Sequence, residues 1–139
     1  MVANAKINLG KGVSTVEFVA DCPAPVAVDD LVYVTGPSVL GVVQVDIVDI
    51  ADRNKMPAIG IVVEKLTSTH CRVLIQGEFT PTTTLTPGKR YFASATGSIT
   101  EVRPVPAANG IAFVQPVGYA IDTSRLVFDP EKIPIITIG

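Results

Sequence analysis

Proline and glycine are spread along the whole chain and divide it into short apolar runs. The 139 residues include 11 Pro and 11 Gly, and no apolar run comes near the roughly 18 residues that a membrane-spanning helix needs. Between these breaks the runs are rich in Val, Ile and Thr, which favour extended strands. A chain of this length fits one domain. The pattern therefore predicts a single all-β domain.

The clearest strands are predicted at residues 58–64 (AIGIVVE) and 70–76 (HCRVLIQ), joined by a connection of hairpin length. Gly60, inside the first of them, predicts a bulge or a close approach of another backbone. Residues 41–50 (GVVQVDIVDI) have apolar positions that also fit a helix, but their alternation favours a strand.

Proline marks two further positions in the predicted sheet. Pro87-Gly88 suits the centre of a type II turn, because Pro presets one φ angle and Gly accepts the positive one. A strand is expected to follow at 89–95. A final pair of strands is predicted at 114–122 and 124–128, and Pro116 in the first of these indicates an edge or a bulge.

The two ends differ from the middle of the chain. Residues 1–20 are expected to form an N-terminal arm or first strand, 21–130 a β domain, and 131–139 a C-terminal strand or arm. The last segment contains four isoleucines: Ile133, Ile135, Ile136 and Ile138. So apolar an end would fray without a cover. It is either the last strand of the barrel or an arm docked on a neighbour, and the sequence leaves both open.

The composition points to contact with other protein chains. Hydrophobic residues make up 47% of the chain, but charged residues only 17%, below the ~25% of typical soluble domains. Surplus apolar surface on a non-membrane protein is most often covered by another protein. A net charge of -2 gives no attraction to nucleic acid or to anionic membranes. The first twelve residues contain no apolar signal-like segment, so synthesis in a cytoplasm is expected.

No arrangement of reactive residues predicts an enzyme. His70, the single histidine, adjoins Cys71, and neighbouring residues of a strand face opposite sides. Cys22 and Cys71 are expected to be buried thiols rather than a disulfide. The sequence contains no CxxC, HExxH or GxSxG motif, and LGKGVST lacks the residue order of a phosphate-binding loop. We therefore expect no catalytic residues and no cofactor.

Three aspartates form the densest acidic cluster: Asp46, Asp49 and Asp52. Apolar residues stand between them where a calcium loop would place further ligands. A solvated strand end is the favoured interpretation, with weak cation binding as the alternative. Aromatic residues are only 6% of the chain and Trp is absent, which argues against a stacking platform for sugars or single-stranded nucleic acid.

Several ordered segments resemble a module of tailed-bacteriophage virion proteins, which include head decoration (cement) proteins and some fibre or tail proteins. They cover about residues 26–130, in the order DDLVYV, MPAIGIVVEK, CRVLIQGEF, LTPGKRYFASATG, VQPVGYAID and RLVFDP. The resemblance implies a small β-barrel or sandwich that assembles as a homo-oligomer, with a trimer favoured. Its implied partner is the major capsid protein, and its implied location is the capsid surface of the virion, after synthesis in the host cytoplasm.

Within this interpretation, the N-terminal arm supplies candidate capsid contacts: Lys6, Ile7, Asn8, Leu9 and Lys11. The alternative is that these residues cover the protein's own barrel. The tail residues Ile133, Ile135, Ile136 and Ile138 are candidate subunit contacts. A second function from the same resemblance is a tail or fibre component that binds host-surface glycan. A third is a trimeric β-rich nucleotide hydrolase, since GYAID is similar to one of its motifs, but the accompanying motifs are missing.

Overall fold

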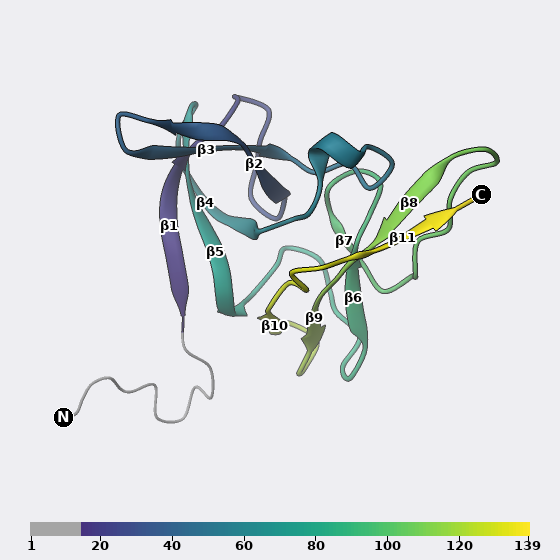
Figure 1. Cartoon of the computed structure of the whole chain (residues 1–139). Coiled ribbons are helices and arrows are strands. Elements are labelled where there is room, and N and C mark those ends of the chain that lie inside the picture. Colours follow the sequence, from purple (N-terminus) through teal and green to yellow (C-terminus); the bar gives the residue numbers. More distant parts are fainter. Residues whose placement is uncertain (1–14) are drawn as a thin grey trace.

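A computed structural model describes residues 15–139, and these residues form an all-β structure of short strands joined by loops and turns (Figure 1). The strands are β1 (Val16–Asp21), β2 (Leu31–Val39), β3 (Val42–Ile47), β4 (Gly60–Thr67), β5 (His70–Phe79), β6 (Arg90–Ala93), β7 (Ile99–Thr100), β8 (Ile111–Val114), β9 (Pro116–Ala120), β10 (Leu126–Phe128) and β11 (Ile135–Ile138). Within the described part of the chain, the one helical element is the 3-10 turn η1 (Arg53–Lys55), and no helix has the length and apolar character needed to cross a bilayer. The predicted all-β class is confirmed.

Five strands close into a small barrel. They follow the order β1-β3-β2-β4-β5, and β1 closes the ring because it pairs with both β3 and β5. The β1–β3 pair is parallel and the other four pairs are antiparallel. Closure leaves these strands without long free edges. The barrel form of the prediction is therefore the one found.

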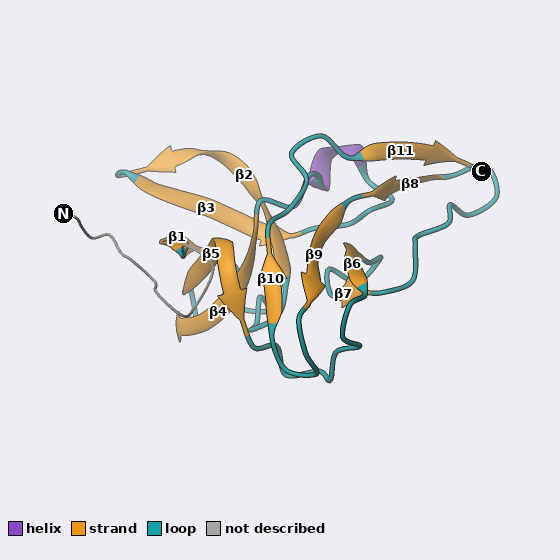
Figure 2. Ribbon diagram, turned by 90° about the horizontal axis from the view of Figure 1, so that it is seen from below, coloured by secondary structure: helices purple, strands orange, loops and turns teal. Residues whose placement is uncertain are grey.

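A second sheet extends from the end of β5. Its residues Gly77–Phe79 pair with β10, and the sheet continues through β9 and β6 to β7 (Figure 2). Strands β8 and β11 form a separate two-stranded sheet. The C-terminal segment is therefore a strand of this small sheet and not the last strand of the barrel. Its docking on a neighbouring subunit stays a prediction.

Two apolar cores lie on opposite faces of the shared strands. The smaller core comprises Ala20, Cys22, Val26, Val32, Val45, Val62, Cys71 and Val73, and the larger one lies between the barrel and the second sheet around Leu31, Ile61, Leu74, Phe113, Leu126 and Phe128. Adjacent residues of β2, β4 and β5 go to different cores, because successive side chains of a strand point to opposite faces. These strands are buried on both sides, which explains their unbroken apolar runs.

Two predictions about glycine are confirmed. At Gly60 an added Cβ would overlap the Val73 side chain and would lie 2.8 Å from the carbonyl oxygen of Leu74, so the predicted close backbone approach is present. At the Pro87-Gly88 turn, Gly88 has a φ of +80° and the turn closes with a 3.2 Å hydrogen bond from the Lys89 N–H to the Thr86 carbonyl.

The predicted irregularity at Pro116 is also confirmed. Pro116 begins β9, which pairs with β6 through a shift of register between Tyr91 and Phe92. The bulge accommodates a residue that has no N–H to donate to the ladder.

Candidate protein-interaction surface

The C-terminal ribbon, which we define as β8 together with residues 133–139, projects from the body of the protein (Figures 1 and 2). Ile135 pairs with Val114 and Ile138 with Ile111. The ribbon is anchored on its β8 side, because the N–H of the buried Phe113 donates to the Ile50 carbonyl at 2.8 Å. Neither strand contains a charged residue. The ribbon is thus an uncharged arm that is fixed at its base.

All four predicted subunit-contact isoleucines are exposed in this ribbon. The exposed fractions are 83% for Ile133, 59% for Ile135, 39% for Ile136 and 76% for Ile138. Among residues 15–139, β11 pairs with no strand other than β8, so its outer edge is open. An exposed apolar edge strand is a ready template for another chain. The structure therefore brings these four residues into one surface suited to protein contact.

The five candidate capsid contacts, Lys6, Ile7, Asn8, Leu9 and Lys11, lie outside the described residues. The structure adds two valines that the sequence reasoning missed, Val102 and Val105, with exposed fractions of 69% and 83%. Both lie in the loop between β7 and β8, and this loop meets the end of the ribbon where Gly139 lies against Ala107. In the sequence, the uncharged run PVPAA is the feature that could have indicated an exposed apolar loop here.

A small apolar pocket lies beside the root of the ribbon. It is lined by Pro57, Ala58, Ile59, Ile75, Pro130 and Lys132 and has a volume of about 240 Å³. We call it the Ile75 pocket. It lies beside β5 between the last β10 pair, Phe128 with Gly77, and the first β4 pair, Ile61 with Leu74, so Ile75 has no paired partner on either strand.

A fully buried glutamine supports the wall of this pocket. Gln115 Nε2 donates to the carbonyl oxygens of Ala58 and Glu131, each at 2.8 Å. Gln115 Oε1 accepts the Ala58 N–H at 2.9 Å. These three bonds tie the segment before β4 to the segment before β11. The pocket and the base of the ribbon are therefore held in one rigid frame.

The histidine lies in a separate open cleft of about 530 Å³ at one end of the barrel. His70 Nε2 is 2.9 Å from Asp21 Oδ1, and its Nδ1 lies 3.0 Å from Thr67 Oγ1 and 3.1 Å from Thr69 Oγ1. Both ring nitrogens are thus engaged by neighbouring groups. This arrangement ties the His70 ring to Asp21 on β1 and to the β4–β5 turn.

Cys71 points to the other side of β5, into the barrel core, as predicted for the residue next to His70. Cys22 and Cys71 are both buried free thiols, so the prediction of thiols rather than a disulfide is confirmed. Burial, followed by the hydrogen bond with the Cys22 thiol, raises the pKa of Cys71 to about 12. A thiol of this kind is unreactive at neutral pH.

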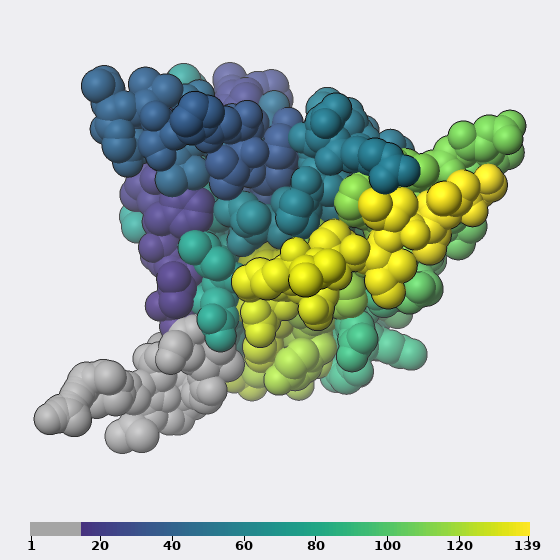
Figure 3. Space-filling view, viewed as in Figure 1, coloured from purple at the N-terminus to yellow at the C-terminus, as the bar shows by residue number. Residues whose placement is uncertain are grey.

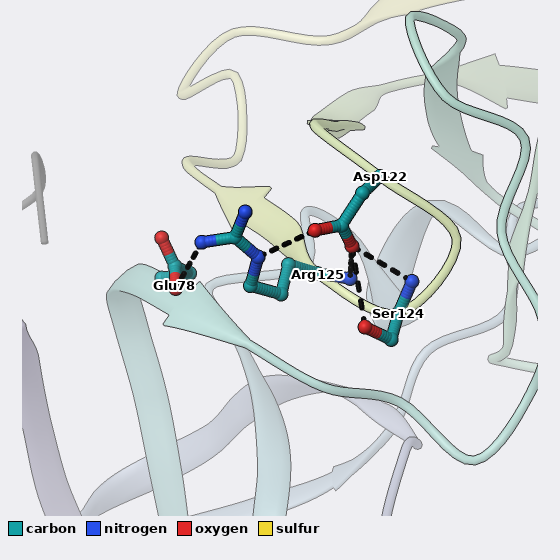
Figure 4. Close-up of polar contacts among 4 residues, drawn as sticks. All are labelled: Glu78, Asp122, Ser124 and Arg125. Carbon is teal, nitrogen blue, oxygen red and sulfur yellow. Dashed lines mark hydrogen bonds and ion pairs between the residues drawn. The ribbon is translucent and has the colours of Figure 1, made fainter.

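A polar cluster closes the turn between β9 and β10 (Figure 4). Asp122 Oδ1 accepts the backbone N–H of Ser124 at 2.9 Å and of Arg125 at 2.8 Å, and its Oδ2 accepts Arg125 Nε at 2.6 Å. The Ser124 N–H and then the Arg125 guanidinium lower the pKa of Asp122 to about 2. Arg125 Nη1 also lies 3.6 Å from Glu78 Oε1 on β5. All hydrogen-bond partners of the Asp122 carboxylate belong to the turn, so the cluster stabilises this turn. We call the cluster the turn lock.

The three acidic residues near η1 are also used locally. Each accepts a backbone N–H close to it in sequence, in the pairs Asp46 with Ile47, Asp49 with Ala51, and Asp52 with Asn54. Over residues 15–139, no three His, Cys, Asp or Glu side chains form a group that could hold a metal ion. The favoured interpretation of these aspartates as a solvated strand end fits their contacts.

A shallow cleft of about 330 Å³ lies on the outer face of the second sheet. Tyr119 on β9 is half exposed there, with Arg90 and Val127 directly opposite it on the two neighbouring strands. Asp129 and Glu131 line the far side of the cleft. An aromatic ring flanked by an arginine and two carboxylates is a surface on which a polar ligand with an apolar face could lie.

Comparisons of the chain with protein-family models, with curated proteins and with solved structures find no match.

Proposed function

We propose that this chain is a structural virion protein that binds the outer surface of a phage capsid and cross-links neighbouring major capsid subunits. The observation that carries the proposal is the C-terminal ribbon, an uncharged arm with four exposed isoleucines. Water-exposed apolar patches of this kind mark protein-contact sites. The order of the motifs in residues 26–130, which resembles that of phage decoration proteins, supports the capsid as the partner.

The proposed mechanism is lateral cross-linking of the shell by a homo-oligomer, with a trimer favoured. Several contacts from one oligomer to a symmetric lattice would act together, so that modest single contacts give firm binding. The N-terminal arm, with Lys6, Ile7, Asn8, Leu9 and Lys11, is proposed to pair with an exposed capsid strand. The tail isoleucines are proposed to contact a neighbouring subunit. The proposal includes no catalysis, cofactor, nucleic acid or membrane.

Co-sedimentation with expanded phage heads that lack this protein tests the function. Saturable binding at a fixed ratio to capsid subunits is expected. A variant without residues 1–12 should lose this binding and keep the oligomeric mass of the full chain. A stable oligomer that never sediments with heads would refute the capsid role, and normal binding by the truncated variant would refute the role of the arm.

The cleft at Tyr119 favours one second candidate, a tail or fibre component that binds host-surface glycan. The exposed ring could stack on a sugar face, while Arg90, Asp129 and Glu131 could bond to its hydroxyls. A glycan array tests this candidate, with Tyr119→Ala as the matched variant. Specific binding that Tyr119→Ala abolishes would support it, and an array without specific signals would exclude it for the glycans displayed.

A further inference from the structure

We propose that the C-terminal ribbon of one copy places isoleucine side chains in the Ile75 pocket of a second copy, so that the subunits join head to tail. The inference rests on the homo-oligomer of the proposed function and specifies its interface. It assigns a donor surface, which is β11 with its exposed isoleucines, and an acceptor surface, which is the pocket at the root of the ribbon.

The ribbon and the pocket belong to the same chain but do not meet within it. The chain passes the pocket at Pro130 and Lys132 and then runs outward, where pairing with β8 holds Ile135–Ile138 away from the body. None of the four tail isoleucines lines the pocket. In Figure 3 the C-terminal segment crosses the visible face and continues onto the projecting arm. Each copy therefore offers one apolar projection and one apolar hollow.

The size and chemistry of the pocket suit an aliphatic side chain. Its volume of about 240 Å³ exceeds the ~150 Å³ of an apolar cavity that holds a benzene ring, so it can take the four-carbon side chain of isoleucine and part of the next residue. Its single charged lining residue, Lys132, lies at the rim, with Nζ 3.3 Å from the Pro130 carbonyl and 3.9 Å from Asp129 Oδ1. A charged ligand would find no free partner deeper in the pocket.

The wall of the pocket is preorganised. Two of its lining residues are prolines, and Gln115 fixes Ala58 through both its N–H and its carbonyl. A preformed site loses little conformational freedom when it is occupied, which favours binding. The ribbon is likewise fixed at its base through Phe113. Both halves of the interface are therefore ordered before they meet.

The contact between two different patches has a consequence for assembly. Such a heterologous contact forms a closed ring or an open filament, whereas a ribbon-to-ribbon contact would form a two-fold dimer. A head-to-tail ring of three is compatible with the proposed trimer. The two arrangements can be separated by the positions that cross-link.

Cysteine cross-linking between two differently tagged variants, Ile135→Cys and Ile75→Cys, tests the arrangement. The native Cys22 and Cys71 are buried and stay in place. Under mild oxidation by oxidised glutathione, we expect the mixed disulfide between the two variants to exceed either self-linked product at least tenfold. Self-linking of Ile135→Cys alone would overturn the inference in favour of a ribbon-to-ribbon dimer. An oligomer without any cross-link, or a monomeric wild type, would overturn it as well.

A matched pair of charge substitutions tests the donor surface. Ile135→Asp should reduce the mass in solution from a multiple of 14.6 kDa to 14.6 kDa, measured by light scattering, with circular dichroism to confirm folding. Leu40→Asp places the same charge at the tip of the β2–β3 hairpin, on the opposite side of the molecule (Figure 1), and should leave the mass unchanged. An unchanged mass for Ile135→Asp would refute the donor role.

The outcome is independent of the capsid test. Head-to-tail cross-links in a protein that ignores phage heads would retain this interface and refute the capsid role. Binding of a monomeric protein to phage heads would refute this interface and retain the capsid role.

Discussion

Gln115 is the residue whose replacement most directly tests the rigid frame around the Ile75 pocket. Gln115→Met keeps nearly the same side-chain volume and removes all three hydrogen bonds. The N–H and carbonyl of Ala58 then lose their partner, and Ala58 is only 2% exposed. The Glu131 carbonyl also loses its bond, but Glu131 is an exposed residue whose carbonyl water can reach more easily.

The expected loss of stability follows from these contacts. A buried polar group without a partner costs about 1–3 kcal/mol, so the two Ala58 groups together predict a loss of about 3 kcal/mol in the free energy of unfolding. Because little volume changes, a cavity adds little to this figure. Gln115→Ala should lose more, since it also leaves a cavity.

Urea denaturation at one fixed protein concentration measures the effect, because assembly would otherwise contribute to the apparent stability. The matched control is Gln76→Met, at an exposed position on β5, for which a change within about 0.5 kcal/mol is expected. A loss below about 1 kcal/mol for Gln115→Met would show that the three bonds do not hold the frame as argued.

Two further predictions concern the barrel and the β9–β10 turn. Gly60→Ala forces a methyl group against Val73 and should destabilise the protein by about 1–3 kcal/mol, whereas Gly36→Ala, with no atom within 4 Å of the new Cβ, should be close to neutral in the same urea titration. The folded-state pKa of Asp122 is lowered to about 2, so its contribution to stability is complete above the ordinary value of 3.8 and is lost as the pH falls through about 2. Carboxyl NMR should show this low midpoint, and a midpoint near 3.8 would contradict the proposed turn lock.

The sequence predicted the local structure better than the long-range arrangement. The strands around Gly60, the Pro87-Gly88 turn and the bulge at Pro116 could be predicted because each depends on the backbone preference of one or two residues. The pairing of β11 with β8 could not, because a short apolar strand fits many partners equally well. Gln115 was missed for a related reason, since its three hydrogen bonds go to two residues that lie 57 and 16 positions away.

The candidate contact surface was predicted in part. The four tail isoleucines stood out as an apolar end that needed a cover, and they are exposed together. The Ile75 pocket had no sequence signal, because it is a gap between the pairing of β5 with β10 and the pairing of β5 with β4. Such a gap depends on strand register across β5, which a single sequence does not specify.

The high apolar content of the chain has two sources: residues buried in the two cores and residues exposed on the surface. Strands β2, β4 and β5 lie between two cores, so adjacent residues such as Ile61 and Val62 are both fully buried. This double burial accounts for much of the hydrophobic composition without any partner. Protein contact is therefore inferred from where exposed apolar residues lie together. Two such places are the projecting elements, the C-terminal ribbon with its four isoleucines and the β2–β3 hairpin with Val39 and Leu40 (Figure 1).

The hairpin tip supports this argument independently. Leu40 and Gly41 both have positive φ angles, +52° and +80°, as a type I′ turn requires, and the first of these positions favours Asn or Asp over leucine. Leu40 is 98% exposed, so the leucine neither eases the turn nor packs against the protein. Leu40→Asn should therefore stabilise the chain by about 1 kcal/mol, the cost of a left-handed leucine. If the hairpin tip contacts the capsid, the same variant should bind heads more weakly in co-sedimentation. A variant that is stabilised and binds heads as well as wild type would confine capsid contact to the rest of the surface.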